Sequence, residues 1–285
     1  MTDLCAMLRR MLNMFYGSLR YDYIFLFRIP DLKTKEKVSF LIKKYFHFFI
    51  DLIRKPPLKR ESIFGKPFYY DDIYGLTSLQ RVYCEHYGLK KMIPINSVII
   101  DVGAHIGQFN FFCSHYLQAR RIISIEPQHN CYEILKLNAC ESKDCINMAV
   151  STSSDDVTIH YSKTSSQLST TIKSSQDMYE GSMDVETVTL DDIAEGMESY
   201  PVDLLKVDTE GSEYDVLCSG MHMISKVRVI AVETSILRES SGNIFKTGTL
   251  LESNHFILRE LDCFSAINPF MANAVFENGS APIQP

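Results

Sequence analysis

Apolar positions follow two alternating periodicities from residue 97 onward. Short apolar runs predict buried strands, and longer segments with apolar residues three and four apart predict helices. Strands are expected at residues 97–102, 121–125, 145–150, 157–161, 185–190, 204–207, 227–233, 255–261 and 274–277, and helices at residues 108–118, 130–141 and 212–220. This alternation predicts an α/β fold with a mostly parallel sheet and helices on both faces. The last two strands are close in sequence, so we expect an antiparallel edge pair there.

The N-terminal part of the chain has a different pattern. Residues 38–53 are the most apolar stretch, but polar side chains interrupt them and sixteen residues are few for a membrane span. Lys43, Lys44, His47 and Asp51 recur at about helical spacing and form one polar stripe. The stretch is therefore expected to be a helix packed on the body of the protein. The alternative is an interfacial helix on anionic lipid, because basic residues flank it on both sides.

A linker and a further helix follow this amphipathic stretch. The segment Arg54–Arg60 contains two adjacent prolines, which end a helix, and is expected to be a linker. Residues 79–89 are expected to be helical. Residues 162–175 are rich in serine and threonine, which predicts a solvated loop or, alternatively, a lid over an active site.

Charge divides the chain into two parts. Residues 1–66 contain 14 Lys and Arg against 6 Asp and Glu, a balance of +8, whereas the remainder contains 15 against 29, a balance of −14. We therefore expect a basic amphipathic helical region over residues 1–66, a helical lead-in over 67–95 and an α/β domain over 96–285. A basic head on an acidic body predicts different partners for the two parts, with anionic membrane as a candidate for the first and no nucleic acid for either.

Cysteine usage and the first residues bear on the compartment. The eight cysteines are scattered without a CxxC pair, which favours free thiols in a reducing compartment and disfavours a structural zinc site. An acid, Asp3, stands where a secretory signal would need basic residues. The expected location is cytoplasmic, with peripheral contact at a membrane surface as an option.

A glycine turn follows the first strand of the alternating region. It runs from Asp101 through Gly103, Ala104, His105 and Gly107 into a helix. Such a turn lets backbone N–H groups approach a polar ligand closely. Asp101 at the strand end favours a positively charged ligand and disfavours a pyrophosphate. The turn therefore indicates S-adenosylmethionine (SAM), which carries an ammonium and a sulfonium.

Further polar residues lie where later strands end. Ligands bind beyond the carboxyl ends of the strands in open parallel sheets. Glu126 follows Asp101 by 25 residues, near the offset at which an acid binds a ribose diol. Asn147 and Met148 are expected to present backbone groups to an adenine edge. Asp208 and Glu233 end two further strands.

Several common catalytic signatures are absent from the sequence. The glycine turn has the spacing GxxxG, which argues against the GxGxxG of NAD- and FAD-binding folds. GxxxxGK[ST] does not occur, which argues against an NTPase, and GxSxG and HExxH do not occur either, which removes the commoner hydrolase signatures.

The motifs together resemble the FkbM family of SAM-dependent methyltransferases. The resemblance covers about residues 78–278, and its most specific element is the Lys-x-Asp-x-Glu-Gly-x-Glu segment from Lys206 to Glu213. It implies a Rossmann-like class I fold in which Asp101, Gly103, Ala104, His105, Gly107 and Glu126 hold SAM. His105 departs from the pattern, since the family usually has Asn there. Both side chains can hydrogen-bond to the methionine end, so we expect binding to survive.

The same resemblance implies methyl transfer to oxygen, commonly to a hydroxyl of a sugar or a natural product. Lys206 and Asp208 are two apart on a strand and share one face. Asp208 is expected to be a polar contact to the methyl-donor site or the base, and Lys206 is expected to orient the nucleophile or keep Asp208 ionised. Glu210 is expected to start the next helix and to point toward the opening of the site at the carboxyl ends of the strands. Asp208 and Glu210 could instead hold Mg²⁺ through oxygen ligands.

We expect the acceptor to be a glycan or a glycolipid. Three alternatives remain: a catalytically silent methyltransferase-like binding module, a methyltransferase for a small natural product, and one for a protein nitrogen. Enzymes of the last class often carry an Asn/Asp-Pro-Pro-aromatic motif after the fourth strand, where this chain has Asp208-Thr-Glu-Gly.

Overall fold

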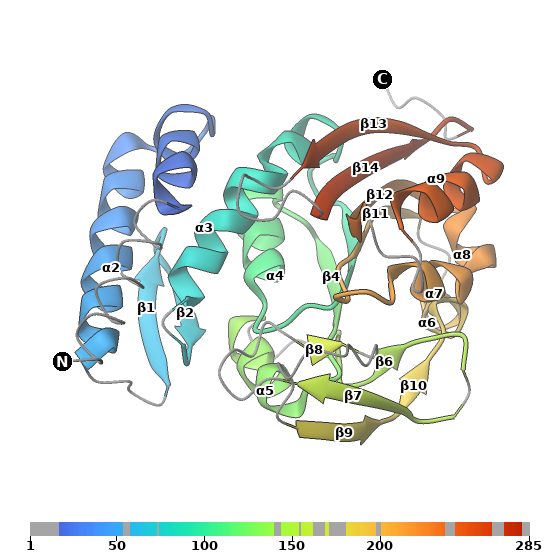
Figure 1. Cartoon of the computed structure of the whole chain (residues 1–285). Helices are drawn as coiled ribbons and strands as arrows, with labels where there is room; N and C mark the ends of the chain where they lie inside the picture. Colours follow the sequence, from blue (N-terminus) through green and yellow to red (C-terminus); the bar gives the residue numbers. More distant parts are fainter. Residues whose placement is uncertain are drawn as a thin grey trace. The chain divides into compact units, whose positions relative to one another are not determined.

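The protein consists of two compact units, Met1–Leu89 and Lys90–Pro285 (Figure 1). The computed structural model describes residues 17–53, 58–72, 74–139, 144–153, 155–161, 169–170, 181–197, 201–236, 243–263 and 271–280. The serine- and threonine-rich segment 162–175, and with it the expected loop or lid, lies outside the described residues except for β8 (Ser169–Thr170).

The first unit contains two helices, a β-hairpin and a third helix. Residues 17–27 are helical, and α2 (Thr34–Ile53) contains the whole apolar stretch, as predicted. β1 (Lys59–Ile63) and β2 (Lys66–Tyr70) pair antiparallel, and α3 (Gly75–His86) follows. The hairpin corrects two expectations. The linker ends before Lys59, and the boundary at 66/67 falls inside a pair of strands that hydrogen bonds hold together.

Aromatic rings form the core of this unit. Phe25 lies 5.0 Å from Phe40 of α2 and 6.2 Å from Tyr83 of α3, measured between ring centroids. Phe64 at the hairpin turn stacks on Phe40 at 5.8 Å. Because the same rings join both helices, the hairpin and α3, the apolar side chains of α2 that face inward are buried within this unit.

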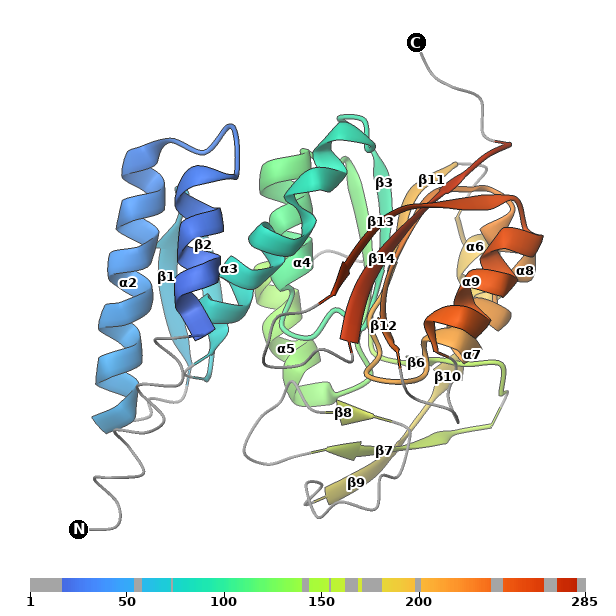
Figure 2. The same cartoon turned by 45° about the horizontal axis from the view of Figure 1, so that its top comes forward.

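The second unit contains a seven-stranded sheet in the order β13-β14-β12-β11-β3-β4-β5 (Figures 1 and 2). The strands are β3 (Val98–Val102), β4 (Arg121–Ile125), β5 (Cys145–Ile146), β11 (Val202–Val207), β12 (Val227–Ser235), β13 (Phe256–Cys263) and β14 (Met271–Asn278). β14 runs antiparallel to both of its neighbours, and the other pairings are parallel. The predicted Rossmann-like sheet with an antiparallel C-terminal pair is confirmed. Of that pair, β13 is the edge strand and β14 lies inside the sheet, next to β12.

Helices cover both faces of this sheet (Figure 2). One face carries α4 (Gln108–Phe112), the π-helical turn Cys113–Leu117 and α5 (His129–Asn138). The other carries α6 (Leu190–Glu195), α7 (Glu213–Cys218), α8 (Met221–Ile224) and α9 (Ile244–Ser253). One apolar core lies on the second side, where Ile100, Leu205 and Ile230 of the strands meet Leu217 and Leu251 of the helices.

Two expected strands are divided. Residues 145–150 form β5 and β6 (Ala149–Val150), because the Asn147 side chain bonds to the carbonyl oxygens of Glu126 and Pro127 and fixes a turn between them. Residues 185–190 end β9 (Gly181–Val185), form β10 (Thr187–Val188) and then begin α6. Thr189 and Asp192 make a reciprocal capping box that starts that helix. β7 (Val157–Tyr161) lies between β8 and β9 in a separate sheet.

Two further findings concern the membrane and the thiols. Among the described residues, every helix is too short or too polar to cross a bilayer. Cys84, Cys113, Cys131, Cys145 and Cys218 are free thiols, as expected.

The central strand gives a direct test of the core. Leu205 is fully buried, whereas Leu261 on the edge strand is 49% exposed. Leu205→Ala should lower the free energy of unfolding by about 2–5 kcal/mol through a cavity, and Leu261→Ala by well under about 1 kcal/mol. Urea denaturation measures both, and equal losses would contradict this placement of the core.

Candidate active site

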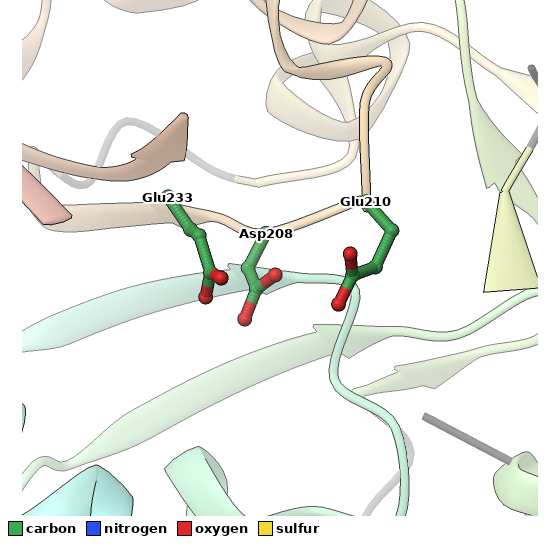
Figure 3. A group of neighbouring side chains, drawn as sticks. All are labelled: Asp208, Glu210 and Glu233. Carbon is green, nitrogen blue, oxygen red and sulfur yellow. The ribbon is translucent and has the colours of Figure 1, made fainter. Parts of the chain in front are cut away.

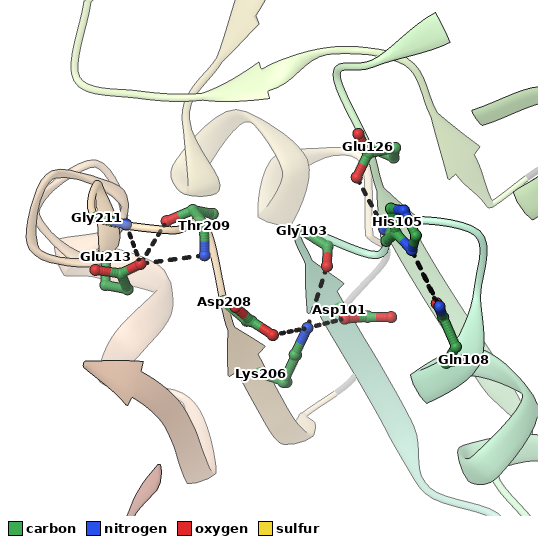
Figure 4. A network of polar contacts seen from close by, with 10 residues as sticks. All are labelled: Asp101, Gly103, His105, Gln108, Glu126, Lys206, Asp208, Thr209, Gly211 and Glu213. Atoms are coloured by element: carbon green, nitrogen blue, oxygen red, sulfur yellow. Dashed lines mark hydrogen bonds and ion pairs between the residues drawn. The ribbon is translucent and has the colours of Figure 1, made fainter. Parts of the chain in front are cut away.

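A buried lysine joins the ends of two central strands. The parallel register of β11 and β3 places Lys206 directly opposite Asp101. The Lys206 Nζ atom lies 3.2 Å from Asp101 Oδ1 and 3.3 Å from Asp208 Oδ2, and it donates a hydrogen bond of 3.1 Å to the Gly103 carbonyl oxygen (Figure 4). One ammonium therefore ties together the glycine turn, the first strand and the segment after β11. We call Asp101, Lys206 and Asp208 the ion triad.

The members of the ion triad differ in their access to solvent. The Asp101 side chain is fully buried and that of Lys206 is 8% exposed, whereas that of Asp208 is 29% exposed. Burial alone would lower the pKa of Lys206, but the two neighbouring carboxylates outweigh it and raise that pKa above its usual value. Burial raises the pKa of Asp101, and Lys206 opposes that shift. Lys206 is therefore protonated, and Asp208 is the member that can meet a substrate.

Gly103 allows the glycine turn and the segment after β11 to come together. Its φ of +77° lies in the left-handed region, and a Cβ atom there would overlap the carbonyl oxygen of Asp208. The Asp208 N–H also donates to the Val102 carbonyl at 3.0 Å. A glycine is thus required at position 103 for the backbone to approach this closely.

The backbone N–H groups of the glycine turn bond within the protein. Those of Gly103 and Ala104 both donate to the Ile125 carbonyl at 3.0 Å, and that of Gly107 donates to the Ala104 carbonyl at 2.8 Å. This corrects the expectation that they face a ligand. Gly107, at a φ of +89°, lets α4 pack on α5, since a Cβ atom would lie 2.9 Å from the Leu135 side chain.

His105 has a left-handed backbone, with a φ of +50°. Histidine and asparagine are both enriched in this conformation among residues other than glycine. This gives a physical reason why His105 can stand where asparagine is usual. Its N–H donates to Glu126 Oε2 at 2.8 Å, and its Nδ1 atom lies 3.0 Å from the Gln108 amide nitrogen (Figure 4).

Glu126 is held in a buried position at the end of β4. Its second oxygen, Oε1, accepts a hydrogen bond of 2.9 Å from the Gln128 N–H. Burial raises the pKa of Glu126 to about 7, against the effect of the two N–H donors. Asn147 supports this turn through its side chain, and Met148 follows it in the break between β5 and β6. The expected cofactor residues are thus gathered at one edge of the sheet.

Three carboxylates form a cluster beside the ion triad. Oxygen atoms of Asp208, Glu210 and Glu233 all lie within 4.8 Å of one another, and the side chains point the same way (Figure 3). The register of Val207 with Val232 brings Glu233 next to Asp208. Glu210 has a φ of +53°, a strained conformation of the kind found at functional sites. Concentrated negative charge of this kind suits a cation, either a sulfonium or a divalent metal ion.

Glu233 was noted from the sequence as an acid at a strand end, like the others, but it was not assigned to the site. What the sequence could not supply was the pairing of β12 with β11, which places Glu233 beside Asp208.

Glu213 has a supporting role in this site. Its Oε1 atom accepts hydrogen bonds from the N–H groups of Thr209 at 3.2 Å and Gly211 at 2.6 Å (Figure 4). The residue is 2% exposed, and burial raises the pKa of its carboxyl group. Glu213 thereby fixes the loop that carries Asp208 and Glu210. This explains the spacing of the last acid in the Lys-x-Asp-x-Glu-Gly-x-Glu segment.

The close approach at Gly103 is testable. Gly103→Ala should cost about 3 kcal/mol of unfolding free energy or more, because the new methyl group overlaps the backbone and the φ is left-handed. Gly248→Ala is the matched control, since Gly248 lies in α9 with no atom near the new Cβ, and it should be neutral or stabilising by up to about 1 kcal/mol. Equal thermal stability of the two variants would contradict this role of Gly103.

Comparison with known proteins places the site in a family. The profile of the Methyltransferase FkbM domain matches residues 101–277, more than half of the chain. The chain is 28% identical over 200 residues to methyltransferase sdnD of Sordaria araneosa, covering 58% of this chain and 75% of that protein. It is 26% identical over 141 residues to the hexuronic acid methyltransferase AglP of Haloferax volcanii, covering 48% of this chain and 56% of AglP, about half its length.

Solved structures with a similar fold include methyltransferase FkbM from Methylobacillus flagellatus. It has a TM-score of 0.44 and 14% identity, covering 84% of this chain and 60% of that one. TYW2 of M. jannaschii in complex with AdoMet has a TM-score of 0.42 and 16% identity, covering 79% and 88%. The profile match includes the glycine turn, Glu126, the segment from Lys206 to Glu213 and Glu233. The chain belongs to the FkbM methyltransferase family.

Proposed function

We propose that the protein transfers a methyl group from SAM to a hydroxyl of a sugar, as part of a glycan or a glycolipid. The observation that carries this proposal is the ion triad. It offers a partly exposed carboxylate, Asp208, beside a buried ammonium at the carboxyl end of the sheet. SAM supplies an electrophilic methyl group on a sulfonium when bound.

On the donor side, Glu126 is the residue for the ribose hydroxyls. Each of its oxygens accepts one backbone hydrogen bond and retains a lone pair for a hydroxyl. Glu210 and Glu233 offset the positive charge of the donor. Asp101 faces Lys206 and is fully buried, so we propose that it acts on the donor site through Lys206.

On the acceptor side, Asp208 takes the hydroxyl proton as the oxygen attacks the methyl carbon. With SAM bound, the carbon–oxygen bond would form as the carbon–sulfur bond breaks with its electron pair going to sulfur, and the proton would move to the carboxylate of Asp208. The ammonium of Lys206 lies 3.3 Å from Asp208 Oδ2 and holds this carboxylate in position. General base catalysis of this kind contributes about 10²–10⁴-fold to the rate.

A neutral hydroxyl is the acceptor that the charges favour. The carboxylate cluster of Asp208, Glu210 and Glu233 repels anionic groups, so a neutral sugar suits this site better than a uronic acid. The similarity to AglP supports a carbohydrate acceptor at the level of chemical class. The products of a methyl-transfer assay distinguish this proposal from the alternatives. A natural-product or protein methyltransferase would label those acceptors instead of a glycan, and a silent module would label none.

A metal-assisted variant of the same reaction is the second candidate. The carboxylate cluster has the oxygen ligands that Mg²⁺ prefers. Turnover that falls on treatment with EDTA and returns with Mg²⁺ would favour this variant, and turnover unaffected by EDTA would favour Asp208 as a metal-free base.

Replacement of the proposed base separates chemistry from binding. Asp208→Asn should lower the rate of tritiated methyl transfer from SAM to glycan and glycolipid extracts by about 100-fold or more, because the amide cannot take the proton. Calorimetry should show SAM affinity within a few-fold of wild type. Asp262→Asn, an exposed site on β13, is the control. Unchanged transfer by the Asp208 variant would reject the proposed base.

The pKa of Glu126 predicts the pH dependence of SAM binding. The ionised carboxylate accepts both ribose hydroxyl protons better than the neutral acid, so SAM affinity should rise as pH increases through about 7. Glu126→Gln should remove this dependence. In the wild type, the folded-state pKa of Glu126 lies above the ordinary value of 4.5. The contribution of Glu126 to the free energy of unfolding is therefore greatest below pH 4.5 and is lost as pH rises through about 7.

Calorimetric titrations with SAM at pH 6 and pH 8 measure this dependence. A wild-type affinity that is equal at both values would contradict the role of Glu126. Absence of SAM binding at both pH values would overturn the proposed function as a whole.

A further inference from the structure

The outward side of α2 is apolar and exposed. Four side chains recur at helical spacing on it: Val38 (43% exposed), Ile42 (65%), Phe46 (59%) and Phe49 (47%). They follow one another at intervals of four, four and three residues, so they line one side of the helix. We call these four residues the α2 stripe. At 1.5 Å per residue the stripe is about 16 Å long.

The α2 stripe is separate from the side on which the helix packs in its own unit. That side is formed by Lys37, Phe40, Lys44, Phe48 and Asp51, all of which are buried. The two rows are offset by about half a turn. The helix therefore packs on its own unit with one side and exposes a second apolar side to solvent. A helix that only packed on its unit would have polar residues in these positions.

The preceding helix repeats the pattern. Leu19 (46% exposed), Tyr23 (54%) and Phe27 (71%) are spaced by four residues and are exposed, and the rings of Tyr23 and Phe27 lie 5.3 Å apart. Exposed apolar residues on both helices exceed the scattered single positions that are normal for a soluble surface.

Exposed basic side chains outnumber exposed acidic ones in this unit, and Lys35 lies on α2 itself, three residues before Val38. Among the described residues of the first unit, six basic side chains are exposed and one acidic side chain, Asp31, is exposed. The basic residues are Arg20, Arg28, Lys33, Lys35, Arg60 and Lys66. Lys35 lies in the first turn of α2, and Arg28 follows the end of the preceding helix. Lys37 and Lys44 contribute little to this surface, because they are buried and bonded to the Ile29 carbonyl and to Asp22 respectively.

We propose that α2 lies on an anionic membrane surface, with the α2 stripe inserted among the lipids and the exposed basic side chains at the headgroups. Apolar residues on one side and cations beside them are the features of interfacial helices. Acidic lipid headgroups complement the excess of exposed basic side chains, six against one acidic side chain. The lipid interior is fluid, so branched and aromatic side chains can insert into it without a partner of matching shape. This proposal is independent of the methyltransferase activity.

Flotation of the full-length chain with lipid vesicles tests the proposal. Binding should be strong to phosphatidylcholine vesicles containing phosphatidylserine and weak to phosphatidylcholine alone. Phe46→Ser should lower the partition coefficient at least about tenfold, because a buried phenylalanine side chain is lost from the lipid. Phe245→Ser is the matched control, since Phe245 lies in α9 of the other unit and is 70% exposed. It should float like wild type.

The electrostatic part has its own pair of variants. Lys35→Gln should lower partitioning to the anionic vesicles about fivefold, the loss expected for one basic residue at such a surface. Lys246→Gln, which is exposed on α9, should leave it unchanged. Circular dichroism of each variant checks that the fold is retained.

Three results would overturn the proposal. They are equal binding of the Phe46 and Phe245 variants, equal binding of the wild type to neutral and anionic vesicles, and failure to float with either vesicle. If light scattering also showed a wild-type dimer that Phe46→Ser dissociates, the α2 stripe would be a self-association surface instead.

Discussion

A buried ammonium between two carboxylates is the constraint on which the active site depends. Lys206 can remain charged below the protein surface only if opposite charges compensate it, and Asp101 and Asp208 do so from two adjacent parts of the backbone. This requirement fixes the register of β11 against β3 and brings the segment after β11 against the glycine turn. Gly103 then has to be a glycine, because the Asp208 carbonyl occupies the place of a side chain.

The same constraint gives each acid of the site a different role. Asp101 is buried and forms an ion pair with Lys206, whereas Asp208 is partly exposed and accessible to a ligand. Glu213 is also buried, and it accepts hydrogen bonds from the N–H groups of the loop that carries Asp208 and Glu210. Glu210 and Glu233 complete a negatively charged mouth. Residues of one chemical type thus divide into buried groups that support the site and accessible groups that can meet a ligand, according to their burial and their partners.

Much of this arrangement could be predicted from the sequence because it rests on local patterns. Apolar runs located the central strands, and the acids at the strand ends do come together in the structure. What failed depended on contacts between distant residues. The β1–β2 hairpin crosses an expected boundary, and Asn147 divides an expected strand through a bond to the neighbouring turn. A different, local cause explains why α9 was not predicted: it contains Gly248 and several weak helix formers. The use of the glycine turn's own N–H groups was also hidden, since Ile125 accepts two of them.

The ion triad is the clearest case of such a long-range feature, and a double-mutant cycle tests it most directly. The measurement is the free energy of unfolding of Asp101→Asn, Lys206→Met and the double variant. We predict that Lys206→Met costs about 3–5 kcal/mol, because it leaves Asp101 buried without its cation, and that adding Asp101→Asn restores about 2 kcal/mol or more. Additive losses, or a Lys206→Met variant as stable as wild type, would contradict the claim that this buried ion pair organises the site.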